Sequence, residues 1–185
     1  PMAFLDISAI MLLAHGLSAS VGVGAVITTD FIFFKFLGDY RITRKEIEVM
    51  KNLSIVIWFS LGCLVLSGMH LLANKTDLLS SPKFLLKMTI VGVIIINGIV
   101  LNTFVTPRLK KISFHEAKTR PTDLPDGIRK IATACGGISI VSWLIAFTLG
   151  SLKSIPFALS TGLSYYFAIL AAIAIFAFLT KKKRG

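Results

Sequence analysis

Hydrophobic residues fall into five long runs that are separated by shorter polar segments. The runs cover residues 7–29, 53–73, 84–106, 131–151 and 156–179. A helix of about 20 apolar residues crosses the hydrocarbon core of a bilayer, because each residue adds about 1.5 Å. The pattern therefore predicts an all-α integral membrane protein, in which about five transmembrane helices form one bundle and residues 1–185 form a single domain.

The first run leaves its position in the membrane open. Apolar residues continue beyond Asp30 as FIFFKFL, so the helix is longer than a bilayer requires. A span over residues 7–29 places His15 near the middle of the membrane and Asp30 at its inner edge, whereas a span over residues 14–36 buries Asp30. A carboxylate inside the membrane is costly unless it is paired, so the first placement is favoured.

Local signals mark the beginnings of three later helices. Thr43 and Glu46 have the spacing of a capping box, which predicts a helix start at this point. Ser81 followed by Pro82 is typical of an N-cap and a first helical residue. Pro156 is expected to open the last helix.

The composition excludes an ordinary soluble domain. The chain has 55% hydrophobic and 16% charged residues, and its mean hydropathy is +0.80. Soluble domains carry roughly a quarter of charged residues. The connecting segments between the runs are also too short to hold a sizeable soluble catalytic domain.

The basic residues lie on alternate sides of the predicted spans. Sixteen of the 20 Lys and Arg residues lie in the first connection, the third connection or the C-terminal tail. The positive-inside rule then predicts an N-terminus outside and a C-terminus in the cytoplasm, in the plasma membrane of a prokaryote. Anionic lipid headgroups are the expected partners of these charges. No nucleic-acid partner is expected, because aromatic residues do not interleave the charges.

Polar side chains inside the apolar runs are the candidate functional residues. The sequence contains no HExxH, CxxC, P-loop or dinucleotide motif. Polar residues within transmembrane helices usually face the bundle interior, which makes His15, His70 and Lys87 the candidates. His70 ends a polar stripe on one helix face. The stripe consists of Ser60, Cys63, Ser67 and His70.

The two histidines indicate a metal or haem site. Imidazole suits iron, copper and zinc, so His15 and His70 are predicted metal ligands and, with Lys87, predicted contacts of haem b or copper. The structural alternatives are a hydrogen bond between helices for His15 and a snorkelling position for Lys87. A haem held by both histidines needs them at similar depth. With the favoured first span they differ by about 7–8 Å, so ligation by a single histidine is equally open.

Three segments carry a resemblance to known membrane proteins. SIVIWFSLGCLVLSGMHLL and SPKFLLKMTIVGVIIINGIVLN are similar to the central hairpin of CopD-type copper-resistance proteins, where Lys87 matches a Lys near the start of the second span. AHGLSASVGVGA, which contains His15, resembles the opening span of CopD-type proteins and of HemJ-type haem-pathway proteins. The resemblance covers about residues 10–110. It implies a helical membrane bundle that handles a metal or haem from its outer half through His15, His70 and Lys87.

Two other classes of function stay open. Polar residues such as Asn97 within the spans favour a small transporter or channel. The short connections and the lack of a complete catalytic constellation favour a structural or assembly subunit, either in a homo-oligomer or beside a membrane partner.

Tyr165 and Tyr166 lie within the last span, so at least one hydroxyl is expected to find a partner inside the bundle.

Overall fold

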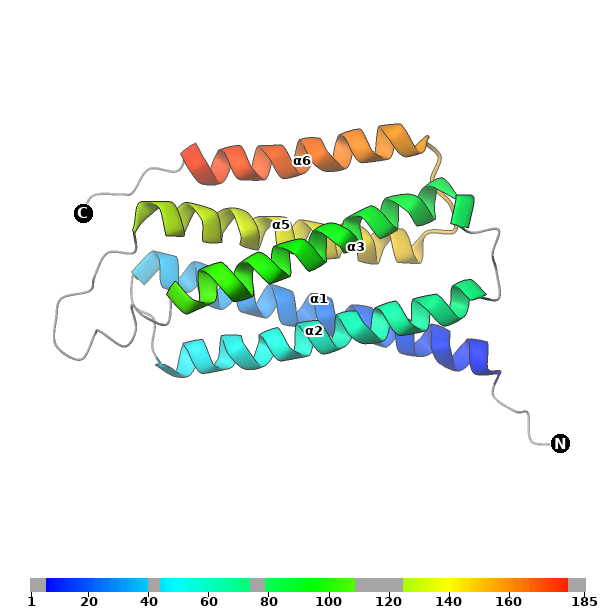
Figure 1. Ribbon diagram of the computed structural model, residues 1–185, viewed down its shortest axis with the longest axis horizontal. Coiled ribbons are helices and arrows are strands. Elements are labelled where there is room, and N and C mark those ends of the chain that lie inside the picture. Colours follow the sequence, from blue (N-terminus) through cyan, green and yellow to red (C-terminus); the bar gives the residue numbers. More distant parts are fainter. Residues whose placement is uncertain (1–5, 40–43, 74–78, 109–124, 180–185) are drawn as a thin grey trace.

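The structure is a computed structural model that describes residues 6–39, 44–73, 79–108 and 125–179. Nearly all of these residues are helical (Figure 1). The helices are α1 (Ile7–Asp39), α2 (Arg44–Ala73), α3 (Pro82–Val100), α5 (Asp126–Ser151) and α6 (Leu159–Leu179), and a π-helical turn, η2 (Leu101–Val105), continues α3.

The described helices confirm the all-α part of the predicted fold class. Five helices, with α3 and η2 counted as one, are long and apolar enough to cross a membrane. Ser81 caps α3 as predicted, since its hydroxyl accepts a hydrogen bond of 3.2 Å from the backbone N–H of Phe84. The predicted cap at Thr43 lies outside the described residues. The last helix begins at Leu159, not at Pro156, because the chain first reverses direction after the extended Leu152.

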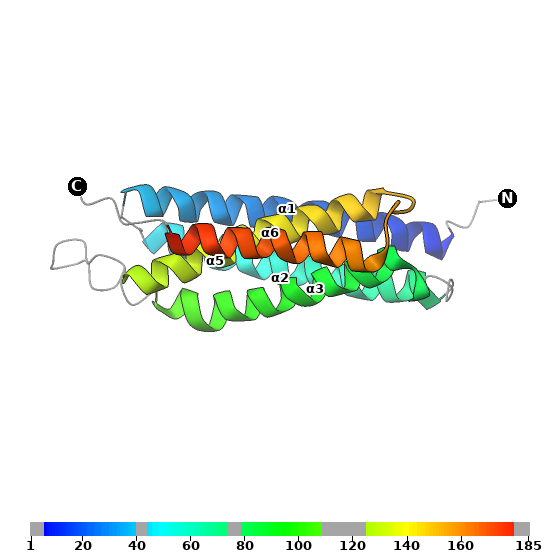
Figure 2. The same cartoon turned by 90° about the horizontal axis from the view of Figure 1, so that it is seen from above.

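The helices form an antiparallel bundle. α1 packs on both α2 and α5, α6 packs on α5, and α3 crosses the bundle obliquely against α5 (Figures 1 and 2). Successive helices run in opposite directions, so α1 begins at the end of the bundle opposite to the end of α6. His15 lies in the first part of α1 and Asp30 in the second. The two ends of the bundle are therefore called the His15 half and the Asp30 half.

Two tryptophans lie against glycines of neighbouring helices. The buried ring of Trp143 on α5 packs on Gly22 of α1, where an added Cβ would lie 2.5 Å from the ring. Trp58 on α2 packs on Gly98 of α3, where an added Cβ would lie 3.1 Å from the ring. Small residues thus allow close helix approach. Trp143 belongs to the central apolar core, together with Val26, Leu61, Leu86, Ile90, Ile94, Leu149 and Tyr166.

Buried hydrogen bonds join α5 to α3 and α6. Asn97 donates from Nδ2 to the carbonyl oxygen of Cys135 over 2.9 Å, as expected for a polar residue between packed helices. The hydroxyls of Ser142 and Tyr166 lie 2.8 Å apart. This pair confirms the prediction that one tyrosine hydroxyl finds a partner in the bundle.

Asp30 is buried, whereas the favoured placement of the first span put it at an interface. Its exposed fraction is 7%. The cause is the packing of α1 on α5 at Gly136. A Cβ added to this glycine would lie 2.9 Å from Oδ1 of Asp30, so the missing side chain provides the room for the carboxyl group.

Candidate functional site

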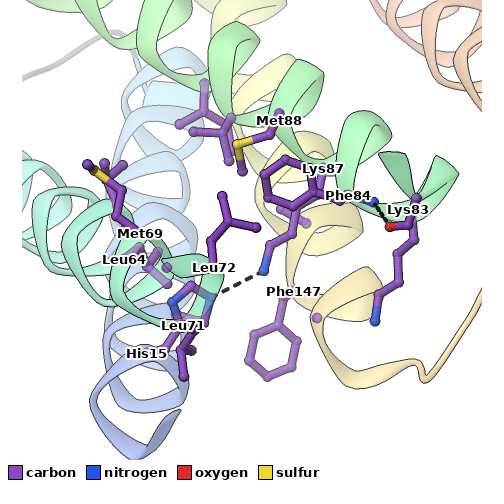
Figure 3. Close-up of a pocket in the computed structure, with 18 of the residues that line it drawn as sticks. His15, Leu64, Met69, Leu71, Leu72, Lys83, Phe84, Lys87, Met88 and Phe147 are labelled. Atoms are coloured by element: carbon purple, nitrogen blue, oxygen red, sulfur yellow. Dashed lines mark hydrogen bonds between the residues drawn. The ribbon is translucent and has the colours of Figure 1, made fainter. Parts of the chain in front are cut away.

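A cavity of about 540 Å³ lies in the His15 half of the bundle. α2 packs mainly on α1, and α3 packs mainly on α5, so the two consecutive helices leave space between them at this end. The wall contains residues of α1, α2, α3 and α5 and of the segment that follows α5 (Figure 3). Pockets for small molecules and cofactors typically have volumes of about 300–1,000 Å³.

Most of the cavity wall is apolar. Its inner side is formed by core residues, among them Leu61, Ile94 and Trp143. Met69 of α2 and Met88 of α3 also line the cavity, and they are 63% and 43% exposed. This part of the cavity wall therefore reaches the outer surface of two apolar helices.

Three lysines give the cavity a cationic rim. Lys83 and Lys87 come from α3, and Lys153 comes from the segment after α5. The Lys83 ammonium group donates a hydrogen bond to the carbonyl oxygen of Leu152, which connects the beginning of α3 to the end of α5. The residues that line the cavity, all from the described part of the chain, include no Asp or Glu.

His15 joins three helices at the edge of this cavity. The Lys87 ammonium group on α3 donates to Nε2 of the imidazole over 3.2 Å (Figure 3). On the other side of the ring, Nδ1 lies 2.9 Å from the Ser67 hydroxyl on α2. The imidazole therefore links α1 to both α2 and α3.

The hydrogen bonds of Ser67 assign the histidine tautomer. The shortest contact of its hydroxyl, 2.6 Å, is a donation to the carbonyl oxygen of Cys63. Because a hydroxyl has one proton, the Ser67 oxygen is the acceptor toward His15, and the imidazole proton lies on Nδ1. Nε2 then has a free electron pair, and this pair accepts from Lys87. A metal ion at His15 would use the same electron pair.

Two glycines provide room for the polar pair. A Cβ added to Gly68 on α2 would lie 3.5 Å from Cε1 of His15, which is ordinary contact distance. A Cβ added to Gly150 on α5 would lie 3.7 Å from Nζ of Lys87. An alanine would therefore fit at either position, in contact with the imidazole or the ammonium group.

The structure brings together two of the three predicted site residues. His15 and Lys87 are in contact and line the cavity. His70 lies one turn beyond Ser67 on α2 and does not line the cavity. Ligation of one haem by both histidines therefore gains no support from the cavity, and the role of His70 stays a prediction.

Sequence reasoning missed Lys83, Lys153 and Ser67 as site residues. The two lysines lie at helix ends, where a basic residue is ordinarily solvated, and only the meeting of α3 with the end of α5 places them at one opening. Ser67 did belong to the predicted polar stripe of α2. Its spacing from His70 gave no reason to connect it with His15, which is 52 positions away.

The remaining polar residues form no second cluster of ligands. Within the described ranges, no group of three or more His, Cys, Asp or Glu residues is arranged to hold a metal ion. Cys63 and Cys135 are free thiols on different helices. Among the described residues, His15 is the one histidine that lines the cavity, where the predicted copper site would lie.

Comparisons with protein-family models, curated proteins and solved structures find no match for this chain. The resemblance to CopD-type and HemJ-type proteins therefore stays a prediction from the sequence. The cavity and its residues are the features of the structure that bear on function.

Proposed function

We propose that this protein crosses the plasma membrane five times and binds an amphipathic anion in the cavity of its His15 half. One observation carries the proposal: an apolar cavity has Lys83, Lys87 and Lys153 at its rim and no carboxylate among the described residues that line it. An apolar body would fill the inner part and displace lipid or water. A carboxylate or phosphate group would pair with the lysines, because the described residues that line the cavity supply no negative charge.

The orientation follows from the positive-inside rule. The Asp30 half contains the first turns of α2 and α5, where basic residues gather, so it faces the cytoplasm. The cavity then lies in the outer half of the bundle. An opening beside the exposed Met69 and Met88 would let a ligand dissolved in the outer leaflet reach the lysines.

Haem b is the amphipathic anion that would use all of the polar groups. The chemistry of the donors fits: His15 offers the electron pair of Nε2 to iron, and the rim lysines offer cations to the propionates. Lys87 would have to release Nε2 first, which its long side chain allows. Bound haem would supply one-electron redox chemistry, with a potential that the axial ligand and its hydrogen bonds adjust. An aliphatic carboxylate or phosphate would use the lysines alone.

An absorption spectrum tests the haem assignment. The full chain is expressed with a haem supplement, purified in mild detergent and measured oxidised and dithionite-reduced, with metal analysis of the same sample. The proposal predicts a Soret band and one haem iron per chain, both lost in His15→Ala and kept in His70→Ala. Copper without a Soret band would support a copper site instead.

The other ligand class is distinguished in the same samples. Lipids extracted from the purified protein are analysed by mass spectrometry, with the Lys83→Met/Lys153→Met double variant as the comparison. A carboxylate or phosphate amphiphile that is present in the wild type and depleted in the double variant supports a non-haem ligand. A protein that is colourless, free of metal and free of any such amphiphile contradicts the proposal and favours a transporter or an assembly subunit.

A further inference from the structure

Asp30 is a buried carboxyl group outside the cavity. It is 7% exposed, and its Oδ2 atom has no hydrogen-bond partner among the described residues. Its other oxygen, Oδ1, lies against the backbone of α5 at Gly136. Polar groups buried in a membrane are expensive, and ionisable residues there usually mark a path or a site. The ligand-binding role proposed for the cavity does not use this residue.

Several charged residues in this half of the bundle form ion pairs with each other. Lys35 of α1 lies 3.2 Å from Glu46 of α2. Arg129 and Lys130 of α5 lie 2.7 and 2.9 Å from Asp126. None of these ion pairs includes Asp30. The other titratable side chains on the described helices that pack against α1 are Lys45, Glu48, Lys51, Cys63 and His70 of α2 and Cys135 of α5.

The surroundings of Asp30 favour a proton over a cation as the group that neutralises its carboxylate. An unpaired carboxylate cannot stay charged at low cost in an apolar environment, so it needs either a cation or a proton. The described residues place no cationic side chain on it, and the amide of Asn97 is already engaged with the carbonyl oxygen of Cys135, the residue before Gly136. A metal cation would need several further oxygen ligands, and the described helices provide no such group of acids.

We propose that Asp30 is a proton-binding site in the Asp30 half of the bundle. A proton from water adds to the carboxylate and forms an O–H bond at Oδ2, and release of the proton to water restores the carboxylate. Neither step needs another reactant. The buried carboxyl group thereby exchanges between a neutral and a charged form. Burial raises the free energy of the charged form.

The proton reaches Asp30 from its own end of the bundle. Asp30 and His15 are 15 positions apart on one continuous helix, which separates them by about 22 Å. Between them lies the apolar core around Val26, Leu61 and Trp143. The proton site and the cavity are therefore separate, and loss of ligand binding in the cavity would leave the proton site intact.

Carbodiimide labelling tests the proposal. Dicyclohexylcarbodiimide partitions into membranes and modifies protonated carboxyl groups there. The full chain is placed in liposomes and treated at a series of pH values, and its peptides are then analysed by mass spectrometry. The proposal predicts an adduct at Asp30 that decreases several-fold as the pH rises, with no adduct at this position in Asp30→Asn. The paired carboxylates of Glu46 and Asp126 serve as internal controls and should remain unlabelled.

A second pair of variants tests whether the space beside the Asp30 carboxyl group controls the pH at which it binds a proton. Gly136→Ala would place a methyl group against Oδ1 and should shift the pH at which labelling falls, whereas Gly127→Ala, where a Cβ meets nothing within 4 Å, should leave the profile unchanged. Size-exclusion profiles establish that each variant is folded. Failure to label Asp30 at any pH in folded protein would overturn the proposal. Equal labelling at every pH would also overturn it, because the proton would then be permanent.

Discussion

The ammonium group of Lys87 lies 3.2 Å from Nε2 of His15, although 72 positions separate the two residues in the chain. This contact joins α3 to α1 across the mouth of the cavity. It also occupies the one imidazole nitrogen that could ligate a metal, because the Ser67 hydroxyl engages the other. Lys87 and a ligand would therefore compete for the same electron pair.

Ser67→Ala should weaken haem binding without abolishing it. The hydroxyl accepts from Nδ1 of His15 and so fixes the ring orientation and the tautomer. Loss of such a hydrogen bond behind a metal ligand typically lowers affinity about 10–100-fold. Haem titrations followed at the Soret band measure the effect. Ser54→Ala, on the same helix but bonded to Asn102, is the matched control and should bind like the wild type.

Gly22→Ala should destabilise the bundle. The new methyl group would lie 2.5 Å from the Trp143 ring, so the ring or α1 must shift, at a cost of about 1–3 kcal/mol. Thermal unfolding in detergent, followed by circular dichroism, measures the loss. Gly24→Ala on the same helix meets nothing within 4 Å and should be neutral or slightly stabilising. Equal melting temperatures for the two variants would contradict the close contact.

Tyr166→Phe should cost about 0.5–2 kcal/mol, because it leaves the buried Ser142 hydroxyl without its partner. Tyr165→Phe is the natural comparison. Tyr165 is 66% exposed and Tyr166 only 2%, so the same chemical change at Tyr165 should have almost no effect. The two unfolding temperatures, measured side by side, decide whether the last helix packs through the face that contains Tyr166.

The five helices were predictable from the sequence because helices that are able to cross a membrane are recognised by their length and composition. Five apolar runs of about 20 residues allow little besides five helices. The cap at Ser81 was also predictable from local sequence. The serine hydroxyl accepts a hydrogen bond from a free backbone N–H of the first turn, and proline is favoured as the first helical residue. The extra length of α1 was visible in the sequence as well.

The candidate site was predictable only in part, because its contacts join distant segments. His15 and Lys87 could be selected as polar residues within apolar runs, but nothing in their spacing brings them together. The burial of Asp30 depends on Gly136 of α5, 106 positions later, where the missing side chain provides the space. Lys153 could not be recognised as a site residue from the sequence, because only the fold brings the end of α5 beside the beginning of α3.

Binding of a fluorescent fatty acid tests the central claim most directly. The probe is titrated into the full chain in detergent, at low and high salt, beside its uncharged methyl ester. The account predicts saturable binding of the acid, weaker binding of the ester, and at least a tenfold loss, about 1.4 kcal/mol, in Lys83→Met/Lys87→Met/Lys153→Met.

Lys45→Met/Lys51→Met, which removes two exposed lysines near the start of α2 at the other end of the bundle, is the control and should bind the acid like the wild type. Haem added to the wild type should displace the acid, because both would occupy one cavity. Equal affinity for acid and ester, with no effect of the three rim substitutions, would contradict an anion-binding cavity at His15 and Lys87.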